Sequence, residues 1–247
     1  MQDVPGDYYQ RLRAIDARHW WHRGMRSLAA ALLEGRLHGA LLDAGCGTGG
    51  FLAWAAGTGA FTRLCGIDLS AEAIEFAREA VPEADLHTAP LDRIPFGDGE
   101  FDVVVTLDVL QHVPESRLDA SLRELRRVMC PGGALLVRTN GDRRARRVRD
   151  DWRAYDAEML AADLRRGGFA VRRLTYANAM LSLAAAARGR RPEAPTGVSC
   201  GIPPVEEGAK AAAGRALLEL ETRIVARGGS LPYGHTLFAL AEREVVS

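Results

Sequence analysis

Residues 41–50 read "LLDAGCGTGG", an apolar pair that runs into an acid and then a glycine-rich loop. A short apolar run that ends in glycine is typical of a buried parallel strand. Gly45, Gly47 and Gly50 also satisfy the G-x-G-x-x-G pattern of dinucleotide-binding folds, and Asp68 lies at the end of the next predicted strand, where an acid would bind a ribose hydroxyl. The glycine pattern alone therefore leaves NAD open as a ligand.

Predicted strands and helices alternate on both sides of this loop. Strands are predicted in "GALLDAG", "FTRLCGIDLS", "ADLHTAP", "FDVVVTLDVL", "ALLVRTN", "FAVRRLTYA" and "HTLFALAERE", with amphipathic helices between most of them. Ser70 is predicted to cap one helix, and Gly57 to close another. This alternation predicts an α/β fold with a doubly wound, mostly parallel sheet of seven strands. Ligands of such sheets bind beyond the carboxyl ends of the strands.

The chain is expected to contain four segments. They are a helical lid at 1–36, a cofactor-binding core at 37–176, an insertion or substrate cap at 177–231, and the final strand at 232–247. The lid carries an aromatic-basic stretch, "RHWWHRGMR", predicted to be exposed between two helical pieces. Within the insertion, residues 188–208 are rich in Pro, Gly and charge and predict a loop, and residues 209–227 predict a helix.

Composition excludes several function classes. The chain has 32 basic and 32 acidic side chains, and a net charge of zero argues against nucleic-acid or anionic-membrane partners. The sequence has neither a signal-peptide core nor an apolar stretch long enough to span a bilayer, so we expect a cytoplasmic monomer or homodimer. The four cysteines form no CxxC pair, and we expect no metal site. Arginine is abundant beside a single lysine, a bias typical of GC-rich bacterial genomes.

Asp43 separates the candidate ligands. A carboxylate two residues before the first glycine would lie unfavourably close to a pyrophosphate, and it suits a ligand that carries positive charge, such as an ammonium or a sulfonium. This argument, together with the "IPFGDGEFDVVVTLDVLQHVP" stretch, disfavours an NAD-dependent oxidoreductase.

The string "LLDAGCGTGG" resembles the first motif of class I S-adenosylmethionine-dependent methyltransferases. "GIDLS" resembles the second motif, and "IPFGDGEFDVVVTLDVLQHVP" and "LRRVMCPGGALLV" resemble the stretches around the fourth and fifth strands. "HWWHRGMR", "GGFAVRRLTYANAM" and "LPYGHTLFALAER" are similar to a bacterial small-molecule subgroup. The resemblance implies a Rossmann-like class I fold with an antiparallel last strand, and S-adenosylmethionine as cofactor.

The resemblance also implies the cofactor contacts. Asp68 would accept hydrogen bonds from the ribose hydroxyls, and Arg23 would grip the cofactor carboxylate. Family members often carry an acid before the "LPF" string, whereas this chain has Pro90 near that position, so adenine recognition is assigned to the next two residues. The expected contacts are Arg23, Asp43, Gly45, Cys46, Gly47, Gly49, Asp68, Leu69, Leu91, Asp92, Leu107 and Asp108.

His112, after the fourth strand, is the candidate general base, or alternatively a residue that orients its loop. The expected acceptor contacts are Trp20, Trp21, His22, Arg138, Asn140, Tyr155, Tyr176 and Asn178. The tryptophan stretch could instead dock the N-terminal helix on the core. Five arginines within residues 143–149 indicate either an anionic acceptor or a solvated surface helix.

Methyl transfer from a sulfonium is an in-line displacement in which positioning supplies much of the rate. The sequence therefore predicts a transferase acting on a nucleophilic O, N or C of a small-molecule or peptide natural-product acceptor, in bacterial biosynthesis. The alternative is a protein of the same fold that binds S-adenosylmethionine but catalyses a rearrangement or acts as a binding module. The motif loop is compatible with both alternatives, because it indicates which cofactor is bound and not which reaction follows.

Overall fold

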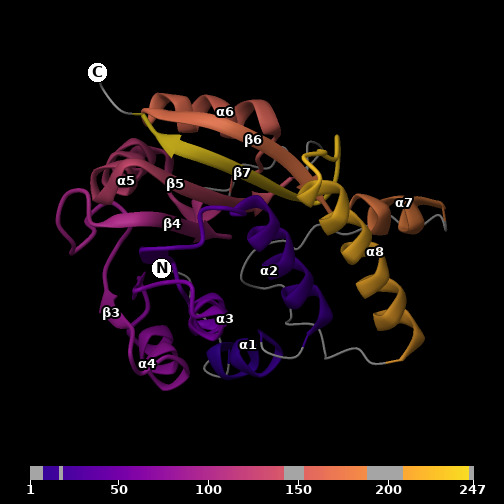
Figure 1. The fold of residues 1–247 in the computed structure, drawn as a ribbon, viewed down its shortest axis with the longest axis horizontal. Helices are drawn as coiled ribbons and strands as arrows, with labels where there is room; N and C mark the ends of the chain where they lie inside the picture. The colour runs from indigo at the N-terminus through magenta and orange to yellow at the C-terminus, as the bar shows by residue number, and fades with distance from the viewer. Residues whose placement is uncertain (1–7, 17–18, 142–152, 188–207, 245–247) are drawn as a thin grey trace.

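The computed structural model describes residues 8–16, 19–141, 153–187 and 208–244. A seven-stranded sheet with the order β3-β2-β1-β4-β5-β7-β6 forms its centre (Figure 1). The strands are β1 (Ala40–Ala44), β2 (Arg63–Asp68), β3 (Asp85–Thr88), β4 (Phe101–Leu107), β5 (Met129–Asn140), β6 (Phe169–Ala177) and β7 (Thr236–Arg243). β1 to β5 pair in parallel, and β7 is antiparallel to both β5 and β6. The predicted fold class and the antiparallel last strand are confirmed.

Helices cover both faces of the sheet. They are α1 (Tyr8–Asp16), α2 (Trp20–Leu32), α3 (Gly50–Thr58), α4 (Ala71–Ala80), α5 (Glu115–Val128), α6 (Ala157–Arg166), α7 (Ala179–Ala187) and α8 (Ala209–Ala226), with a short 3₁₀ helix η1 (Leu110–His112). The period of two along a strand sends neighbouring side chains to opposite faces. Leu42 therefore packs in a cluster with α5 and α6, whereas Leu41 packs in a cluster with α2, α3, α4 and α8.

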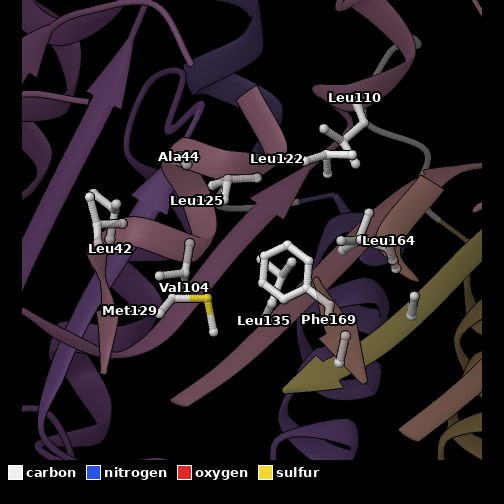
Figure 2. Close-up of a cluster of buried hydrophobic side chains, with 14 of the residues drawn as sticks. Leu42, Ala44, Val104, Leu110, Leu122, Leu125, Met129, Leu135, Leu164 and Phe169 are labelled. Carbon is white, nitrogen blue, oxygen red and sulfur yellow. The ribbon is translucent and has the colours of Figure 1, made fainter. Parts of the chain in front are cut away.

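Figure 2 shows the first of these clusters, in which side chains of the sheet meet those of α5 and α6. Leu118, Leu122 and Leu125 recur at helical spacing on α5 and are fully buried. Burying each such side chain stabilises the fold by about 1.5–3 kcal/mol. This packing is what fixes α5, and with it the loop that follows β4.

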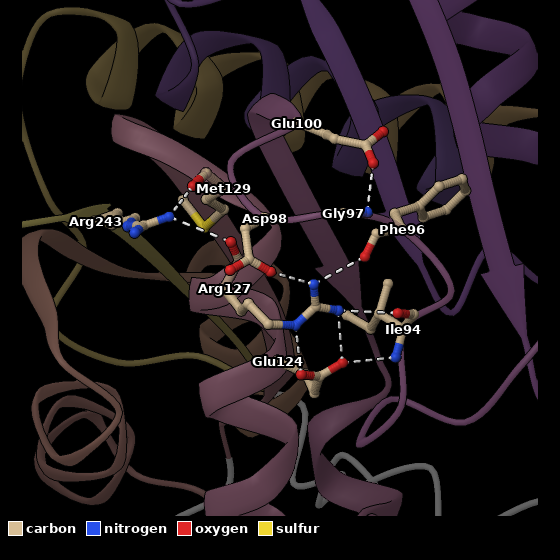
Figure 3. A network of polar contacts seen from close by, with 9 residues as sticks. All are labelled: Ile94, Phe96, Gly97, Asp98, Glu100, Glu124, Arg127, Met129 and Arg243. Atoms are coloured by element: carbon tan, nitrogen blue, oxygen red, sulfur yellow. Dashed lines mark hydrogen bonds and ion pairs between the residues drawn. The ribbon is translucent and has the colours of Figure 1, made fainter.

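One arginine holds the loop that leads from β3 to β4. Arg127 of α5 donates to the carbonyl oxygens of Ile94 and Phe96 at 3.0 and 2.8 Å, and it pairs with Asp98 and Glu124, both at 2.7 Å (Figure 3). Charge-assisted bonds of this kind are the stronger ones in proteins. They fix the "IPF" segment against α5 and set the course of the residues just before it.

Two local expectations need correction, one further helix was not predicted, and one predicted loop lies almost wholly outside the described residues. The aromatic-basic stretch is not an exposed link between helices, because α2 begins at Trp20 and its apolar face carries Met25 and Leu28 into the core. The helix expected to close at Gly57 runs to Thr58 and ends at Gly59, whose φ of 64° is left-handed. The insertion holds α7 as well as the predicted helix, and it begins directly after β6. The predicted loop at 188–208 lies outside the described residues except for its last position.

Candidate functional site

The glycine loop joins the end of β1 to the start of α3. Gly45, Gly47 and Gly49 have φ values of 101°, 52° and 81°, in the left-handed region that favours glycine. A Cβ on Gly45 would lie 2.1 Å from Cγ2 of Val109, and a Cβ on Gly49 would lie 3.0 Å from Cα of Ala77. Backbone conformation therefore requires glycine at all three positions, and close packing requires it at Gly45 and Gly49 as well.

Asp68 ends β2 and fastens this loop to the next turn. Its Oδ2 accepts from the backbone N–H of Gly47 at 2.9 Å, and its Oδ1 accepts from that of Ser70 at 2.9 Å. Burial raises the pKa of Asp68, and the backbone donors oppose that effect. The side chain of Leu69 beside it is 61% exposed. A carboxylate and an apolar surface thus lie together at the carboxyl edge of the sheet.

Asp43 lies at the same edge, at the end of β1, and is 2% exposed. Its Oδ1 has no hydrogen-bond partner among the residues that the structure describes. Burial, followed by the charge of Asp68, raises the pKa of Asp43 to about 8, whereas the charge of Arg138 opposes the rise. A buried polar atom without a partner costs about 1–3 kcal/mol. A ligand that brings a donor or a positive charge would remove that cost.

Helix α1 lies over the glycine loop, which the sequence did not predict in residue detail. A Cβ on Gly50 would lie 1.5 Å from Oδ2 of Asp16, so α1 approaches the start of α3 closely. Asp16 pairs with Nδ1 of His22 at 2.8 Å and with Nη1 of Arg26 at 3.2 Å. Burial opposes these partners, and together their hydrogen bond and charges lower the pKa of Asp16. Ion pairs between α1 and α2 thus close this side of the site.

Two arginines of α2 differ in orientation. Arg23, the expected contact of a ligand carboxylate, is exposed. Arg26, three residues later, is half-buried and donates from Nη2 to the carbonyl oxygen of Asp16 at 2.9 Å. The predicted arginine is therefore exposed, whereas Arg26 is the cation bonded to Asp16 beside the glycine loop. The spacing of three residues is close to one helical turn, so the sequence alone did not separate them.

A second polar group lies where β4 and β5 end. Asp108 has a φ of 61°, and its Oδ2 accepts from Nη2 and Nε of Arg138 at 2.6 and 3.1 Å. The guanidinium of Arg138 lies 5.3 Å from the ring centroid of Trp21. Nε1 of Trp21 donates to Oδ1 of Asn178 at 3.2 Å. The structure thus brings together four residues that the sequence proposed for the site.

Four other expected site residues have different surroundings. Both carboxylate oxygens of Asp92 accept from Arg117, with Nε–Oδ2 at 2.6 Å, and this pairing lowers the pKa of Asp92. Leu91 is half-buried against the main cluster. His112 ends η1 with an exposed side chain, and Leu107 of β4 is half-buried. Asp92 is thus paired with an arginine of α5, a contact that no local pattern predicts.

Three of the expected acceptor contacts, Asn140, Tyr155 and Tyr176, bond to the backbone near residues 155–157. The backbone N–H of Tyr155 donates to Oδ1 of Asn140 at 2.9 Å, and the hydroxyl of Tyr176 accepts from the N–H of Ala157 at 3.2 Å. The side chain of Tyr155 is fully buried, and its burial raises the pKa of the hydroxyl. In this conformation the side chain of Tyr155 packs in the hydrophobic cluster formed with α5 and α6.

His235 is a residue that the sequence analysis missed. It directly precedes β7, and its carbonyl oxygen accepts from the N–H of Gly141 at 2.9 Å. Both ring nitrogens are buried, and neither has a hydrogen-bond partner within the described ranges. A histidine close to the turn "PYG" was the available signal. The arginine-rich stretch at 143–149 and the two acids after it lie outside the described residues.

Three cysteines lie among the described residues and are free thiols: Cys46 and Cys65 are buried and Cys130 is half-buried. Among the described residues, no group of three His, Cys, Asp or Glu side chains is placed to hold a metal ion. Within the same residues, no helix is both long and apolar enough to cross a membrane.

Comparisons with known proteins agree with this arrangement. Residues 42–137 match the family described as a methyltransferase domain. A malonyl-(acyl-carrier protein) O-methyltransferase of Erwinia pyrifoliae is 37% identical over 113 residues, which cover 45% of this chain and 41% of that protein. The chain spans about half the length of the curated relatives that it matches.

Solved structures share the fold over nearly the whole chain. The (4+2)-cyclase SpnF has a TM-score of 0.61 at 24% identity, covering 94% of this chain and 85% of that chain. The N-methyltransferase NodS of Bradyrhizobium japonicum WM9, in complex with S-adenosyl-l-homocysteine, has a TM-score of 0.59 at 16% identity, covering 98% and 93%. At these identities the likeness establishes the Rossmann-like fold. The matched domain, the fold and the glycine loop of this chain are similar to those of class I S-adenosylmethionine-dependent methyltransferases.

Proposed function

We propose that the protein transfers the methyl group of S-adenosylmethionine to a nucleophilic O, N or C atom of a small-molecule or peptide acceptor. The observation that carries the proposal is the buried carboxyl of Asp43, whose Oδ1 has no partner among the described residues. A ligand with an ammonium and a sulfonium group supplies donors and positive charge at this point, whereas a pyrophosphate supplies neither.

The remaining cofactor contacts follow from the same edge of the sheet. Asp68 keeps lone pairs for the ribose hydroxyls beyond its two backbone donors, and the exposed side chain of Leu69 offers an apolar face to the adenine. The backbone of Gly45 to Gly49 lies against the methionine part. We assign the methionine carboxylate to Arg26 in place of Arg23, because Arg26 is held beside the loop.

The bound cofactor supplies an already activated methyl group. The residues of this chain must therefore position the acceptor and exclude water from it. Helix α1 supports the second task, because Asp16 and Leu12 lie over the glycine loop. His112 would receive a proton where the acceptor atom carries one, and the charge of Asp108 is held in place by Arg138.

Segments 1–36 and 177–231 are proposed to act as one cap over the core segment 37–176 and the final strand at 232–247. The packing of α2 against α8 supports this division: a Cβ on Gly24 would lie 2.5 Å from Cδ1 of Leu218. We place the reaction in the biosynthetic metabolism of the bacterial cytoplasm, on the strength of the arginine-rich composition with its single lysine.

The test incubates the purified protein with methyl-labelled S-adenosylmethionine and a panel of phenols, carboxylic acids, amines and short peptides. Methyl transfer predicts methylated product and S-adenosylhomocysteine in equal amounts, and at a limiting cofactor concentration Asp68→Ala is expected to lower both together. The fold likeness to a (4+2)-cyclase keeps a second candidate, a rearrangement without transfer. Conversion of an acceptor without formation of S-adenosylhomocysteine would favour that candidate and refute the proposal.

A further inference from the structure

A carboxylate of the insertion lies fully buried against the start of α7. Glu221 of α8 is 0% exposed. Its Oε2 accepts from the backbone N–H of Asn178 at 2.7 Å, and its Oε1 accepts from that of Met180 at 2.8 Å. The first N–H groups of a helix lack partners within the helix, and an acid there is favoured by the helix dipole. Glu221 therefore fixes the point where β6 passes into α7.

Asn178 carries this constraint to two other elements. Its backbone has a φ of 62°, a left-handed conformation that needs support in any residue other than glycine. Its Nδ2 donates to Oγ1 of Thr236 in β7 at 2.8 Å, and its Oδ1 accepts from Nε1 of Trp21 in α2 at 3.2 Å. One amide thus connects the insertion, the last strand and the lid.

Trp21 passes the constraint on to the edge where the cofactor residues lie. Its ring lies 5.3 Å from the guanidinium of Arg138, which pairs with Asp108 at 2.6 Å. Helix α2 packs closely against α8 here, because a Cβ on Gly214 of α8 would lie 2.7 Å from Cη2 of Trp20. Figure 1 shows α8 running beside α2 along one flank of the sheet.

We propose that Glu221 is a positioning residue: through Asn178 it sets Trp21 and Arg138, and so controls the affinity of the cofactor site from the insertion. The proposal rests on the proposed function. Burying a carboxylate is costly unless its oxygens are satisfied. Both carboxylate oxygens of Glu221 accept from backbone N–H groups of the turn between β6 and α7. The side-chain amide of Asn178 in that turn accepts from Nε1 of Trp21.

The test measures S-adenosylhomocysteine binding by calorimetry in wild type, Glu221→Gln, Trp21→Phe and the double variant. In Glu221→Gln, the side-chain N–H₂ faces one of the two backbone N–H groups that the carboxylate accepted from. In Trp21→Phe, residue 21 keeps an aromatic ring but lacks the indole N–H that donates to Asn178. Each single change is expected to weaken binding roughly fivefold to tenfold. Both changes break the same chain of contacts from Glu221 through Asn178 to Trp21. The affinity of the double variant is therefore expected to be no lower than that of the single variant with the lower affinity.

Glu219→Gln is the matched control, since Glu219 is exposed on the same helix and loses the same charge. It should bind like wild type. If Glu221→Gln does not fold, Asn178→Gly takes its place, because glycine keeps the left-handed backbone without the amide. Wild-type affinity in these variants, or losses that multiply in the double variant, would overturn the positioning role alone. Failure of wild type to bind would overturn the proposed function, and this inference with it.

Discussion

The variant Asp43→Asn separates the effect of the buried Asp43 carboxyl on folding stability from its effect on cofactor binding. The folded pKa of Asp43 is about 8, against an ordinary value of 3.8. Between pH 3.8 and about pH 8, the carboxyl group of Asp43 is protonated in the folded chain and ionised in the unfolded chain. The contribution of Asp43 to stability is therefore greatest at low pH, falls by about 1.4 kcal/mol per pH unit, and levels off above about pH 8. At neutral pH this loss amounts to roughly 4 kcal/mol.

Asn removes the titrating group at nearly the same volume. The free energy of unfolding of the variant, relative to wild type, is thus expected to rise steadily from about pH 4 to about pH 8 and then remain level. Urea unfolding in one-unit pH steps measures it. Asp119→Asn is the control, because Asp119 is an exposed partner of Arg166. Wild-type and variant curves that run parallel over this range would refute the argument that Asp43 is protonated in the ligand-free protein.

The same variant is expected to lose cofactor affinity while it gains stability. A cationic ligand lowers the pKa of a neighbouring carboxyl, so binding to wild type near neutral pH should release a proton. Calorimetry in buffers of different ionisation enthalpy detects that proton. Binding heats that do not depend on the buffer would show that Asp43 does not ionise on binding.

Three further predictions concern single residues. Asp68→Ala is expected to weaken cofactor binding by about 1.5–3 kcal/mol, because it removes a charged acceptor; unchanged affinity in calorimetry would contradict the ribose assignment. Gly45→Ala adds a Cβ 2.1 Å from Val109 at a φ of 101°, so thermal unfolding should show a loss of about 1–3 kcal/mol, and a wild-type midpoint would be inconsistent with this loop. His112→Ala should keep cofactor affinity, and near-wild-type turnover would exclude an essential base.

Local patterns sufficed for the sheet and its motif loops. The apolar run before Asp43, the β-branched centre of β4 and the cap at Ser70 all specify structure through neighbours in the chain, and the structure has each element where the pattern placed it. The position of Asp68 at the end of β2, bonded to the glycine loop, agrees with the pattern for the same reason. The fold class depends on this kind of information.

Contacts between distant helices were not predictable in the same way. The choice between Arg23 and Arg26 depends on the rotation of α2 against α1, and one helical turn separates the two. Glu221 reaches the backbone of Asn178 only because α8 packs against the start of α7, and no spacing in the sequence expresses that contact. Asp92 was assigned to adenine from its position, but an arginine of α5 takes both of its oxygens.

The central claim is that the loop after β1 and the acids beside it bind a sulfonium nucleoside. Calorimetric titration of the unmodified protein with S-adenosylmethionine, S-adenosylhomocysteine and NAD tests it most directly. We predict dissociation constants on the order of micromolar for the first two ligands, and no heat of binding for NAD. Binding of NAD, without binding of either S-adenosyl compound, would contradict the account and restore the dinucleotide interpretation of the glycine pattern.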